Sequence, residues 1–367
     1  MLYPKCADGN GAVMSVDDAE LQEFLAILES FSRLRVGVVG DLVADSYVYG
    51  IPCRLSREAP VIILRHEREE FFPGGAANTV SNLLCMGAKV QVVGMVGQDA
   101  EGDRLLCVLA ELGAETGLVL RSRGWQTIAK SRILAGDYHT KKQQVLRIDR
   151  EPDRRPTDEE IALVAERIRE AAPDVDAWIV SDYGYNLVGE RILGAMREEA
   201  ARGKVVVADS RYRIRECRGL TLVTPNESEL LSAYGFEQSG VDRAPGSSIE
   251  DLVADVGGRL LRDLGSQGVL VTRGNKGMML FEPGRAPVVV PISGSADIVD
   301  VSGAGDTVVS AVTLALAGRS SFLRAARLAN VAAGVKVMKH GTRPVSSSEV
   351  RRAAFRLALN GRGPSHN

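Results

Sequence analysis

A run of seven residues near the carboxyl end of the chain has the composition of a site for phosphoryl transfer. It reads DVSGAGD over residues 300–306 and leads into an apolar, helix-forming stretch over 307–317. Small residues let the backbone approach a ligand closely, and the unpaired amides at a helix start favour an anion. We therefore expect Gly303, Ala304 and Gly305 to form an anion hole for charge that develops on a transferring phosphoryl group.

Asp306 follows this predicted anion hole directly. A carboxylate at its mouth can accept the proton of an attacking hydroxyl, and the amides should keep the carboxylate ionised, so that it orients the hydroxyl and takes the proton late. The alternative is that Asp306 only caps or charges a helix start, since short glycine motifs recur without function. The complete string, with an acid at each end, is more specific than a lone G-x-G and favours phosphoryl transfer.

A second candidate site follows the predicted strand over 220–224. Asn226 and Glu229 are three residues apart and so share one helical face, at the carboxyl end of a strand where α/β sheets bind ligands. Their oxygen atoms suit a hydrated Mg²⁺ or phosphate positioning. The same spacing is that of a capping box, which needs no metal, and both roles can coexist.

Two glycines and an asparagine mark a third candidate site. Gly74 and Gly75 open a predicted helix that runs to Met86, and Asn78 lies in its first turn. The glycines permit close approach of a ligand, and the asparagine can bind a polyol hydroxyl. The alternative is a tight turn with close helix packing.

Two aspartates form a fourth candidate site. Asp41 and Asp45 come just after the predicted strand over 34–40. Carboxylates suit sugar hydroxyls because each can accept several hydrogen bonds. The alternatives are an N-cap for Asp41 and a solvated turn for Asp45.

The segments that must position these residues alternate between strand and helix. Continuous apolar runs are typical of strands buried on both faces of a parallel sheet, and they cover 34–40, 91–97, 177–182, 204–209, 220–224 and 268–273. Helix-length segments lie between them at 100–113, 156–171, 188–202 and 249–264. This alternation predicts a doubly wound α/β domain with a mostly parallel sheet.

Two segments interrupt the alternation. Residues 44–66 and 124–149 contain strand-like stretches of mixed polarity, and both follow strands of the main sheet, so they are expected to meet as a small β-sheet lid. An amphipathic leader helix is predicted over 16–32. We therefore divide the chain into an N-terminal tail and leader helix (1–30) and one large domain (31–360) that contains the lid.

Composition excludes several classes of protein. The 45 basic and 47 acidic residues give a net charge of −2, and aromatic residues are 5% of the chain, which argues against nucleic acid or an anionic membrane as a partner. No apolar run has membrane-spanning length. The five cysteines form no C-x-x-C pair, and Cys85 and Cys107 are expected in the core. With no secretory signal, we expect a soluble, cytoplasmic protein.

Common catalytic motifs are missing from the sequence. It contains no G-x-x-x-x-G-K-[ST], no strand-borne G-x-G-x-x-G, no H-E-x-x-H and no G-x-S-x-G. A P-loop enzyme, a dinucleotide-binding domain, a zinc protease and an α/β-hydrolase are therefore not indicated.

The order of the three glycine- and acid-containing motifs resembles the ribokinase-like (phosphofructokinase-B) carbohydrate kinases. GGAAN at 74–78, N-x-x-E at 226–229 and DVSGAGD at 300–306 occur in that order, and the match runs from about Arg35 to Pro344. The resemblance implies a three-layer α/β/α sandwich with a small β-lid that often forms a homodimer. It also implies a kinase that uses ATP and Mg²⁺, with K⁺ near Asp300 in some members.

The resemblance assigns roles to single positions. Asp306 would be the catalytic base beside the Gly303–Gly305 anion hole, and Asn226 with Glu229 would hold Mg²⁺ through water. The implied ATP-binding residues are Asn226, Thr272, Arg273, Gly274, Ser302 and Asn330. The implied sugar-binding residues are Asp41, Asp45, Gly74, Gly75 and Asn78.

Within the family, the chain is most similar to the kinase half of bacterial enzymes that phosphorylate O1 of D-glycero-D-manno-heptose 7-phosphate in ADP-heptose synthesis. The segments that carry this similarity are 40–50, 55–61, 73–78, 143–149 and 181–184. The expected partner is thus a small sugar phosphate, with a separate nucleotidyltransferase acting downstream. A same-fold kinase of another sugar, and a non-catalytic sugar- or nucleotide-sensing protein, are the alternatives.

Two departures concern the phosphate of that substrate. Tyr185 and Arg211 stand where the heptose kinases commonly have lysines. Arg211 keeps the positive charge with a different geometry, whereas Tyr185 removes it. Lys130, Arg132 and Lys142 on the lid are the other candidate phosphate ligands.

Overall fold

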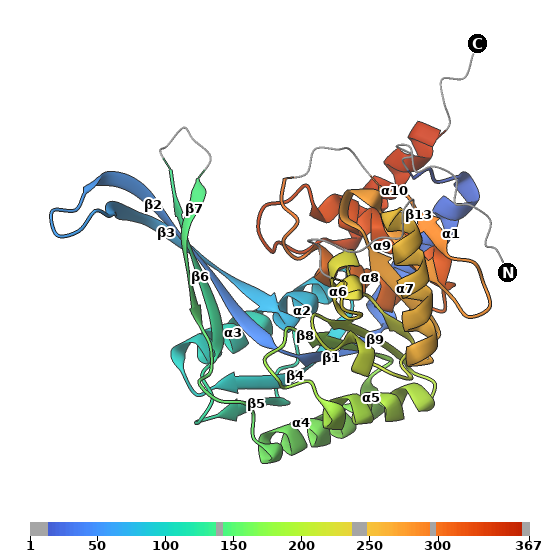
Figure 1. Ribbon diagram of the computed structural model, residues 1–367, viewed down its shortest axis with the longest axis horizontal. Helices are drawn as coiled ribbons and strands as arrows, with labels where there is room; N and C mark the ends of the chain where they lie inside the picture. Colours follow the sequence, from blue (N-terminus) through green and yellow to red (C-terminus); the bar gives the residue numbers. More distant parts are fainter. Residues whose placement is uncertain (1–13, 137–141, 237–247, 294–298, 362–367) are drawn as a thin grey trace, which may run out of the picture.

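A nine-stranded sheet forms the centre of the protein (Figure 1). The computed structural model describes residues 14–136, 142–236, 248–293 and 299–361 of the chain. The strand order is β13-β12-β11-β10-β9-β8-β1-β4-β5, parallel throughout except that β12 runs antiparallel to both of its neighbours. The strands are β1 (Arg35–Gly40), β4 (Lys89–Gly97), β5 (Val119–Ser122), β8 (Ala177–Asp182), β9 (Val205–Ser210), β10 (Leu222–Val223), β11 (Gly268–Thr272), β12 (Met278–Phe281) and β13 (Val288–Val290).

The predicted doubly wound sheet is confirmed, and it contains three strands that the sequence did not indicate. All six predicted strands are present, and their bounds agree with the predicted ones to within two residues at each end. The sequence missed β5, β12 and β13, which are only three or four residues long and lie at the two sides of the sheet. Such short edge strands carry too few residues for a periodic apolar signal.

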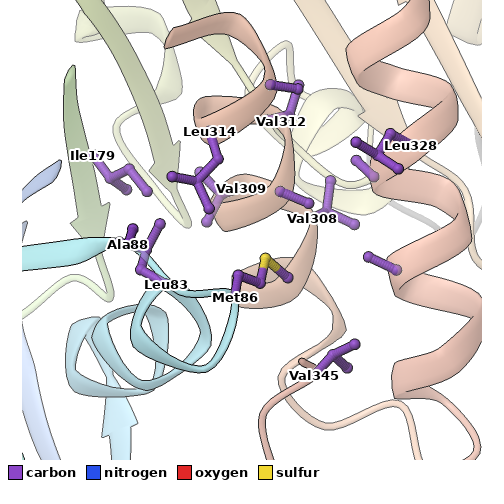
Figure 2. Packing of buried hydrophobic residues seen from close by; sticks show 14 of the residues in the cluster. Leu83, Met86, Ala88, Ile179, Val308, Val309, Val312, Leu314, Leu328 and Val345 are labelled. Atoms are coloured by element: carbon purple, nitrogen blue, oxygen red, sulfur yellow. The ribbon is translucent and has the colours of Figure 1, made fainter. Parts of the chain in front are cut away.

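Helices cover both faces of the sheet, which makes the three-layer sandwich. Strand side chains alternate between the faces: Val38 and Ile179 belong to one hydrophobic core, and Val39 and Val180 to the other. Figure 2 shows part of the first core, to which Met86 at the end of the second helix, Val308 and Leu328 contribute. The helices are α1 (Asp18–Ser30), α2 (Ala76–Cys85), α3 (Ala100–Glu111), α4 (Asp158–Ala171), α5 (Glu190–Ala201), α6 (Glu227–Ser232), α7 (Ile249–Leu264), α8 (Ala304–Ala317), α9 (Phe322–Lys336) and α10 (Ser347–Gly361).

A second sheet of four strands projects from the main domain, as the blue and green ribbons of Figure 1 show. Its order is β3-β2-β6-β7, with β2 (Leu42–Leu55), β3 (Ile62–Gly75), β6 (Ile128–Ala135) and β7 (Gln143–Arg150). The two segments predicted to form a lid therefore do meet, through parallel pairing of β2 with β6. The first segment is longer than predicted, because β3 continues beyond residue 66 to the start of α2.

The predicted leader helix is α1, and it packs into the first hydrophobic core. Asp17 caps its start by accepting a hydrogen bond from the Glu20 amide (2.8 Å). Phe24 and Phe31 are buried in the core that also holds α8 and α9. Residues 1–13 of the predicted tail lie outside the described residues.

Two cysteine predictions are wrong. Cys85, the last residue of α2, and Cys107, on α3, are both exposed rather than in the core. Each lies on the side of an amphipathic helix that faces away from the sheet, so an apolar neighbourhood in sequence did not place them inside. In the described part of the chain, no helix is both long and apolar enough to span a membrane.

Candidate active site

The 300–306 motif forms a turn that leads into α8 at the carboxyl edge of the main sheet. Gly303 is the N-cap of α8, with a left-handed φ of +75°. A Cβ atom at this position would lie 2.6 Å from Asn78 Nδ2, so a larger residue does not fit. Ser302 and Gly305 are exposed, and the turn is therefore open to a ligand, as predicted.

Asp306 lies deeper than the sequence suggested. The residue is 4% exposed, and three side chains donate hydrogen bonds to its carboxylate: Asn78 Nδ2 to Oδ2 (2.6 Å), and the hydroxyls of Tyr183 (2.8 Å) and Thr79 (3.1 Å) to Oδ1. Burial raises the pKa of Asp306, and these three bonds oppose the rise. The prediction of an exposed carboxylate held by backbone amides is wrong in both respects: α8 packs on α2, which buries the carboxylate, and side chains rather than amides donate to it.

Asp41 binds a loop instead of capping a helix. Its Oδ2 accepts hydrogen bonds from the backbone amides of Tyr183 (2.8 Å) and Tyr185 (3.2 Å), while its buried Oδ1 has no partner among the described residues. Burial and the nearby Asp182 carboxylate raise the pKa of Asp41 to about 7. Tyr183 therefore joins Asp41, through its amide, to Asp306, through its hydroxyl.

Asp45 lies inside β2 and is 4% exposed, so the alternative of a solvated turn is excluded. Its Oδ1 accepts a hydrogen bond from Arg132 Nη1 of β6 (2.7 Å), a contact that links the lid strands. Gly74 of β3 pairs with Val43, two residues before Asp45, and a Cβ atom on Gly74 would come within 2.4 Å of Asp45 Oδ2. Gly75 has a φ of +55° and precedes α2. Both glycines thus allow close packing around Asp41 and Asp45. Asn78 lies in the first turn of α2.

The N-x-x-E motif is a capping box in the structure. Asn226 Oδ1 accepts from the Glu229 amide (2.8 Å), and Glu229 Oε2 accepts from the Asn226 amide (2.9 Å), at the start of α6. The prediction of a capping box is thus confirmed. The two residues can also contribute to a metal site, and that role stays a prediction. Burial raises the pKa of Glu229.

The residues predicted to contact ATP divide into two groups. Thr272, at the end of β11, pairs with Asn226, and Gly274 follows with a φ of +57° and open space at its Cβ position. Arg273 is also predicted to contact the phosphates of ATP. In the structure, its buried guanidinium forms ion pairs with Glu227 and Glu250, both at 2.9 Å. Asn330, expected beside the nucleotide, instead donates from Nδ2 to the Pro291 carbonyl (2.6 Å).

Asp209, at the end of β9, lies near enough to Glu229 and Asp306 to feel the charge of both carboxyl groups. Repulsion from Glu229 and Asp306 adds to burial in raising the pKa of Asp209 well above its usual range, and Asp209 Oδ2 is 3.7 Å from the position of a Cβ on Gly305. Carboxylate and amide oxygens are the ligands that Mg²⁺ prefers. No group of three His, Cys, Asp or Glu within the described ranges is arranged to hold a metal directly. The oxygen atoms of Asp209, Asn226 and Glu229 are of the kind that a cation bound partly through water needs, and the metal role of Asn226 and Glu229 stays a prediction.

Positive side chains line a hollow beside Tyr183. The hollow has a volume of about 520 Å³. Five basic residues line it together with the loop 183–186 and two acidic residues, so positive charge is in excess; the basic residues are Lys130, Arg147, Arg154, Arg155 and Arg211, and the acidic ones are Glu151 and Asp153. Lys130 donates to the hydroxyl of Tyr185 (2.8 Å). The guanidinium of Arg211 lies 5.3 Å from the ring centre of Tyr183. Two lid residues that were predicted to bind the substrate phosphate do not line this hollow. Arg132 is paired with Asp45, and Lys142 is paired with Glu67.

Sequence reasoning missed three residues of this site. Thr79, Tyr183 and Asp209 were not assigned roles, although all three lie at or next to motifs that had been noted. Asp209 and Tyr183 end or follow strands of the main sheet, and this position at the carboxyl edge is the signal that would have selected them.

Comparisons with known proteins support the fold described above. The family model described as "pfkB family carbohydrate kinase" matches residues 35–349. The chain is 37% identical over 327 residues to the bifunctional protein HldE of Desulfatibacillum aliphaticivorans, and 37% identical over 326 residues to that of Shewanella amazonensis. These alignments cover 88% of this chain but only 63% and 64% of the relatives, so the chain spans just under two thirds of their length.

Solved structures show the same fold. Ribokinase of Arabidopsis thaliana, complexed with ribose and ATP, superposes with a TM-score of 0.63 at 22% identity and covers 89% of this chain and 98% of its own. Phosphofructokinase-2 of Escherichia coli, in complex with substrates and products, gives 0.68 at 18% identity, with 89% and 99% covered. Both support the ribokinase-like, three-layer architecture.

Proposed function

The chain belongs to the pfkB family of carbohydrate kinases and is a phosphotransferase that acts on a sugar hydroxyl; we propose that its acceptor is D-glycero-D-manno-heptose 7-phosphate, phosphorylated at O1 by ATP. The observation that carries the substrate choice is the cation-lined hollow beside Tyr183. It adjoins the residue that binds Asp306, so a sugar with a distal phosphate can place its phosphate among the cations and its far hydroxyl at the carboxylate. The similarity of segments 40–50, 143–149 and 181–184 to heptose kinases supports the same choice.

The proposed transfer uses Asp306 as the base. The O1 hydroxyl of the sugar binds the carboxylate, which Asn78, Thr79 and Tyr183 hold in one orientation. The O1 oxygen forms a bond to the γ-phosphorus, the bond from that phosphorus to the β,γ-bridging oxygen of ATP breaks, and the hydroxyl proton passes to Asp306. A raised pKa brings the carboxylate closer to the proton affinity that this step needs. The amides at the start of α8 face the charge on the transferring group.

The sugar would lie between the two aspartates near β1 and β2. Asp41 Oδ1 is buried and unpartnered among the described residues, which leaves it free to accept a hydroxyl, and Asp45 lies on the adjoining strand. Arg211, which forms no ion pair within the described part of the chain, is the main candidate for the distal phosphate, with Lys130 beside it.

The capping box and Asp209 would hold Mg²⁺ partly through water. Bound there, the ion would neutralise phosphate charge that the protein's own carboxylates would otherwise repel. The K⁺ expected near Asp300 is not part of this proposal.

A panel of sugars and sugar phosphates, assayed for ADP release, tests the acceptor. We expect the heptose 7-phosphate to give the highest kcat/KM and the unphosphorylated heptose a much lower value. A preference for a neutral sugar would contradict the distal phosphate, whereas faster turnover of another sugar phosphate would change the sugar but keep the phosphate site.

The Asp306→Asn variant tests the base. We expect kcat to fall by at least about a thousandfold, because the amide cannot take the proton, while ATP binding measured by calorimetry is kept. Asp103→Asn, which changes a first-turn aspartate of α3 that is paired with Arg121 on the surface, is the matched control. Turnover near the normal rate in Asp306→Asn would refute its role.

A further inference from the structure

A buried lysine behind the anion hole has no role in the proposed transfer. Lys336 is the last residue of α9, and its side chain is fully buried, at 0% exposure. Its ammonium donates one hydrogen bond, to the carbonyl of Gly341 (2.6 Å). Within the described ranges, no carboxylate lies within ion-pair distance of Nζ. Burying an ammonium group without an ion-pair partner lowers the free energy of unfolding, so its presence here calls for a physical explanation.

The surroundings of Lys336 connect it to the 300–303 turn. Its Cε lies 3.5 Å from the position of a Cβ on Gly303, the N-cap of α8. The same Gly341 that accepts from Nζ donates its amide to Asp300 Oδ2 (2.8 Å), and Asp300 Oδ1 accepts from the Ser302 amide (2.8 Å). One residue, Gly341, thus joins the ammonium, through its carbonyl, to the aspartate that shapes the turn, through its amide.

Two further contacts tie the same segments together. The carbonyl of Val337, next to Lys336, accepts from the amides of Val299 (2.8 Å) and Asp300 (3.1 Å). The hydroxyl of Thr342, next to Gly341, is buried without a partner among the described residues. Lys336 therefore lies in a small polar enclosure made by the end of α9, the 341–342 backbone and the 299–303 turn.

We propose that Lys336 is a positioning residue that acts as a built-in monovalent cation for the anion hole: its ammonium fixes the 300–303 turn and adds positive charge behind the start of α8, so that the kinase needs no exchangeable monovalent cation. This inference rests on the proposed phosphoryl transfer. An ammonium group and a potassium ion carry the same charge, have similar size and bind the same carbonyl oxygens.

Burial lowers the pKa of Lys336 below its ordinary value, and the neighbouring Lys339 adds to this lowering. Asp300 and Asp306 oppose it, because both carboxylates favour the ammonium form. In turn Lys336 lowers the pKa of Asp300. A charge in a low-dielectric site acts strongly on neighbours, so an ammonium behind Gly303 strengthens the positive potential that the α8 amides present to a phosphoryl group.

The test compares the wild type with Lys336→Ala in buffers of constant ionic strength, made with KCl, NH₄Cl or choline chloride. We expect the kcat of the wild type to be the same in all three. We expect Lys336→Ala to lose at least tenfold in kcat in choline chloride and to recover at least half of that loss in KCl or NH₄Cl, because the vacated enclosure can take a small cation.

Lys339→Ala is the matched control. Its ammonium also donates to a carbonyl five residues further on, that of Pro344 (2.7 Å), but pairs with Glu349 of α10 and not with the anion hole. We expect the kcat of this variant to be the same in all three salts. If Lys336→Ala does not fold, Lys336→Met and Lys336→Arg replace it, with the loss expected for methionine and not for arginine.

A melting experiment gives a readout that does not depend on turnover. KCl, compared with choline chloride, should raise the melting temperature of Lys336→Ala and leave that of the wild type and Lys339→Ala unchanged. The proposal is overturned by a wild type that requires K⁺, by full activity of Lys336→Ala in choline chloride, or by a loss that no small cation restores. A wild type without kinase activity would contradict the proposed function, while the melting shift would still decide whether a cation site exists.

Discussion

At the scale of single residues, Tyr183 connects the parts of the site. Its amide binds Asp41, its hydroxyl binds Asp306, and its ring lies under the guanidinium of Arg211. One residue thus fixes the distance between the proposed sugar, base and phosphate positions. In the proposed function, Tyr183 therefore fixes where the distal phosphate of the substrate lies relative to its reacting hydroxyl.

Arg211→Ala tests the phosphate end of this arrangement. An exposed guanidinium with no ion pair among the described residues should bind a phosphate through charge-assisted hydrogen bonds. We expect the KM for the sugar phosphate to rise by at least about tenfold and the KM for ATP to change little, in steady-state assays that vary each substrate. Arg285→Ala, a surface arginine near Glu282, is the control. An equal rise in both KM values would count against this assignment.

Asp41→Asn tests the raised pKa. With a pKa of about 7 in the folded protein and 3.8 as its ordinary value, Asp41 binds a proton on folding between these two limits. The stability that it contributes is therefore present at low pH and is lost as the pH rises towards 7. Asparagine keeps an oxygen for the amides of Tyr183 and Tyr185 and does not titrate.

We therefore expect Asp41→Asn to gain stability relative to the wild type, by on the order of a few kcal/mol, between pH 4 and pH 7. Urea unfolding at several pH values measures this difference. Asp158→Asn, at an exposed helix start, should give a curve parallel to that of the wild type. A constant difference between Asp41→Asn and the wild type would show that Asp41 does not titrate in this range.

At the scale of elements, the crossing of α2 and α8 places the proposed base. Asn78 and Thr79 in the first turn of α2 donate to Asp306 in the first turn of α8, and the glycine at 303 allows the two helix starts to approach. The lid strands supply the other half: β2 carries Asp45, and β6 brings Arg132 to it. The site thus depends on pairing between elements that are far apart in the chain.

Phe24→Ala tests whether α1 belongs to the kinase core. The phenylalanine is completely buried in the core that includes α8 and α9. We expect a loss of about 3–5 kcal/mol in the free energy of unfolding, measured with urea, because truncation leaves a cavity. Leu163→Ala, which removes a largely exposed side chain of α4, should cost well under 1 kcal/mol. A loss of that small size in Phe24→Ala would show that α1 is only loosely attached.

At the scale of the whole molecule, the lid carries an unusual number of exposed apolar side chains. Leu55, Val61 and Ile62 at the β2–β3 end are more than half exposed, as are Val145 and Leu146 of β7. Clustered exposed apolar residues mark interaction surfaces. The expected homodimer through the lid would cover them.

Ile62→Asp tests this dimer. We expect the wild type to have the mass of a dimer in light scattering after size exclusion, and the variant to shift towards the monomer, because a buried carboxylate without a partner opposes association. Leu163→Asp, an exposed apolar position on α4, should leave the mass unchanged. A monomeric wild type at micromolar concentration would contradict a lid dimer.

The sequence by itself determined the main elements and the local form of the central motif. Apolar strand runs, the Asn226–Glu229 capping box and the glycine turn before Asp306 are local features, because the residues that define them lie within a few positions of one another. Such patterns survive in a single sequence, and the family resemblance added the order of the motifs. The fold class, the second sheet and the glycine turn at the start of α8 were therefore predictable.

The tertiary structure alone decided what surrounds the motif. Asp306 meets Tyr183 across 123 positions of sequence and Asn78 across 228, and Lys336 reaches Asp300 through Gly341. These contacts arise because parallel strands gather distant loops at one edge of a sheet, where no periodic pattern records which side chains will face each other. The depth of Asp306 and the lysine behind the anion hole follow from helix packing, which is a property of the whole fold.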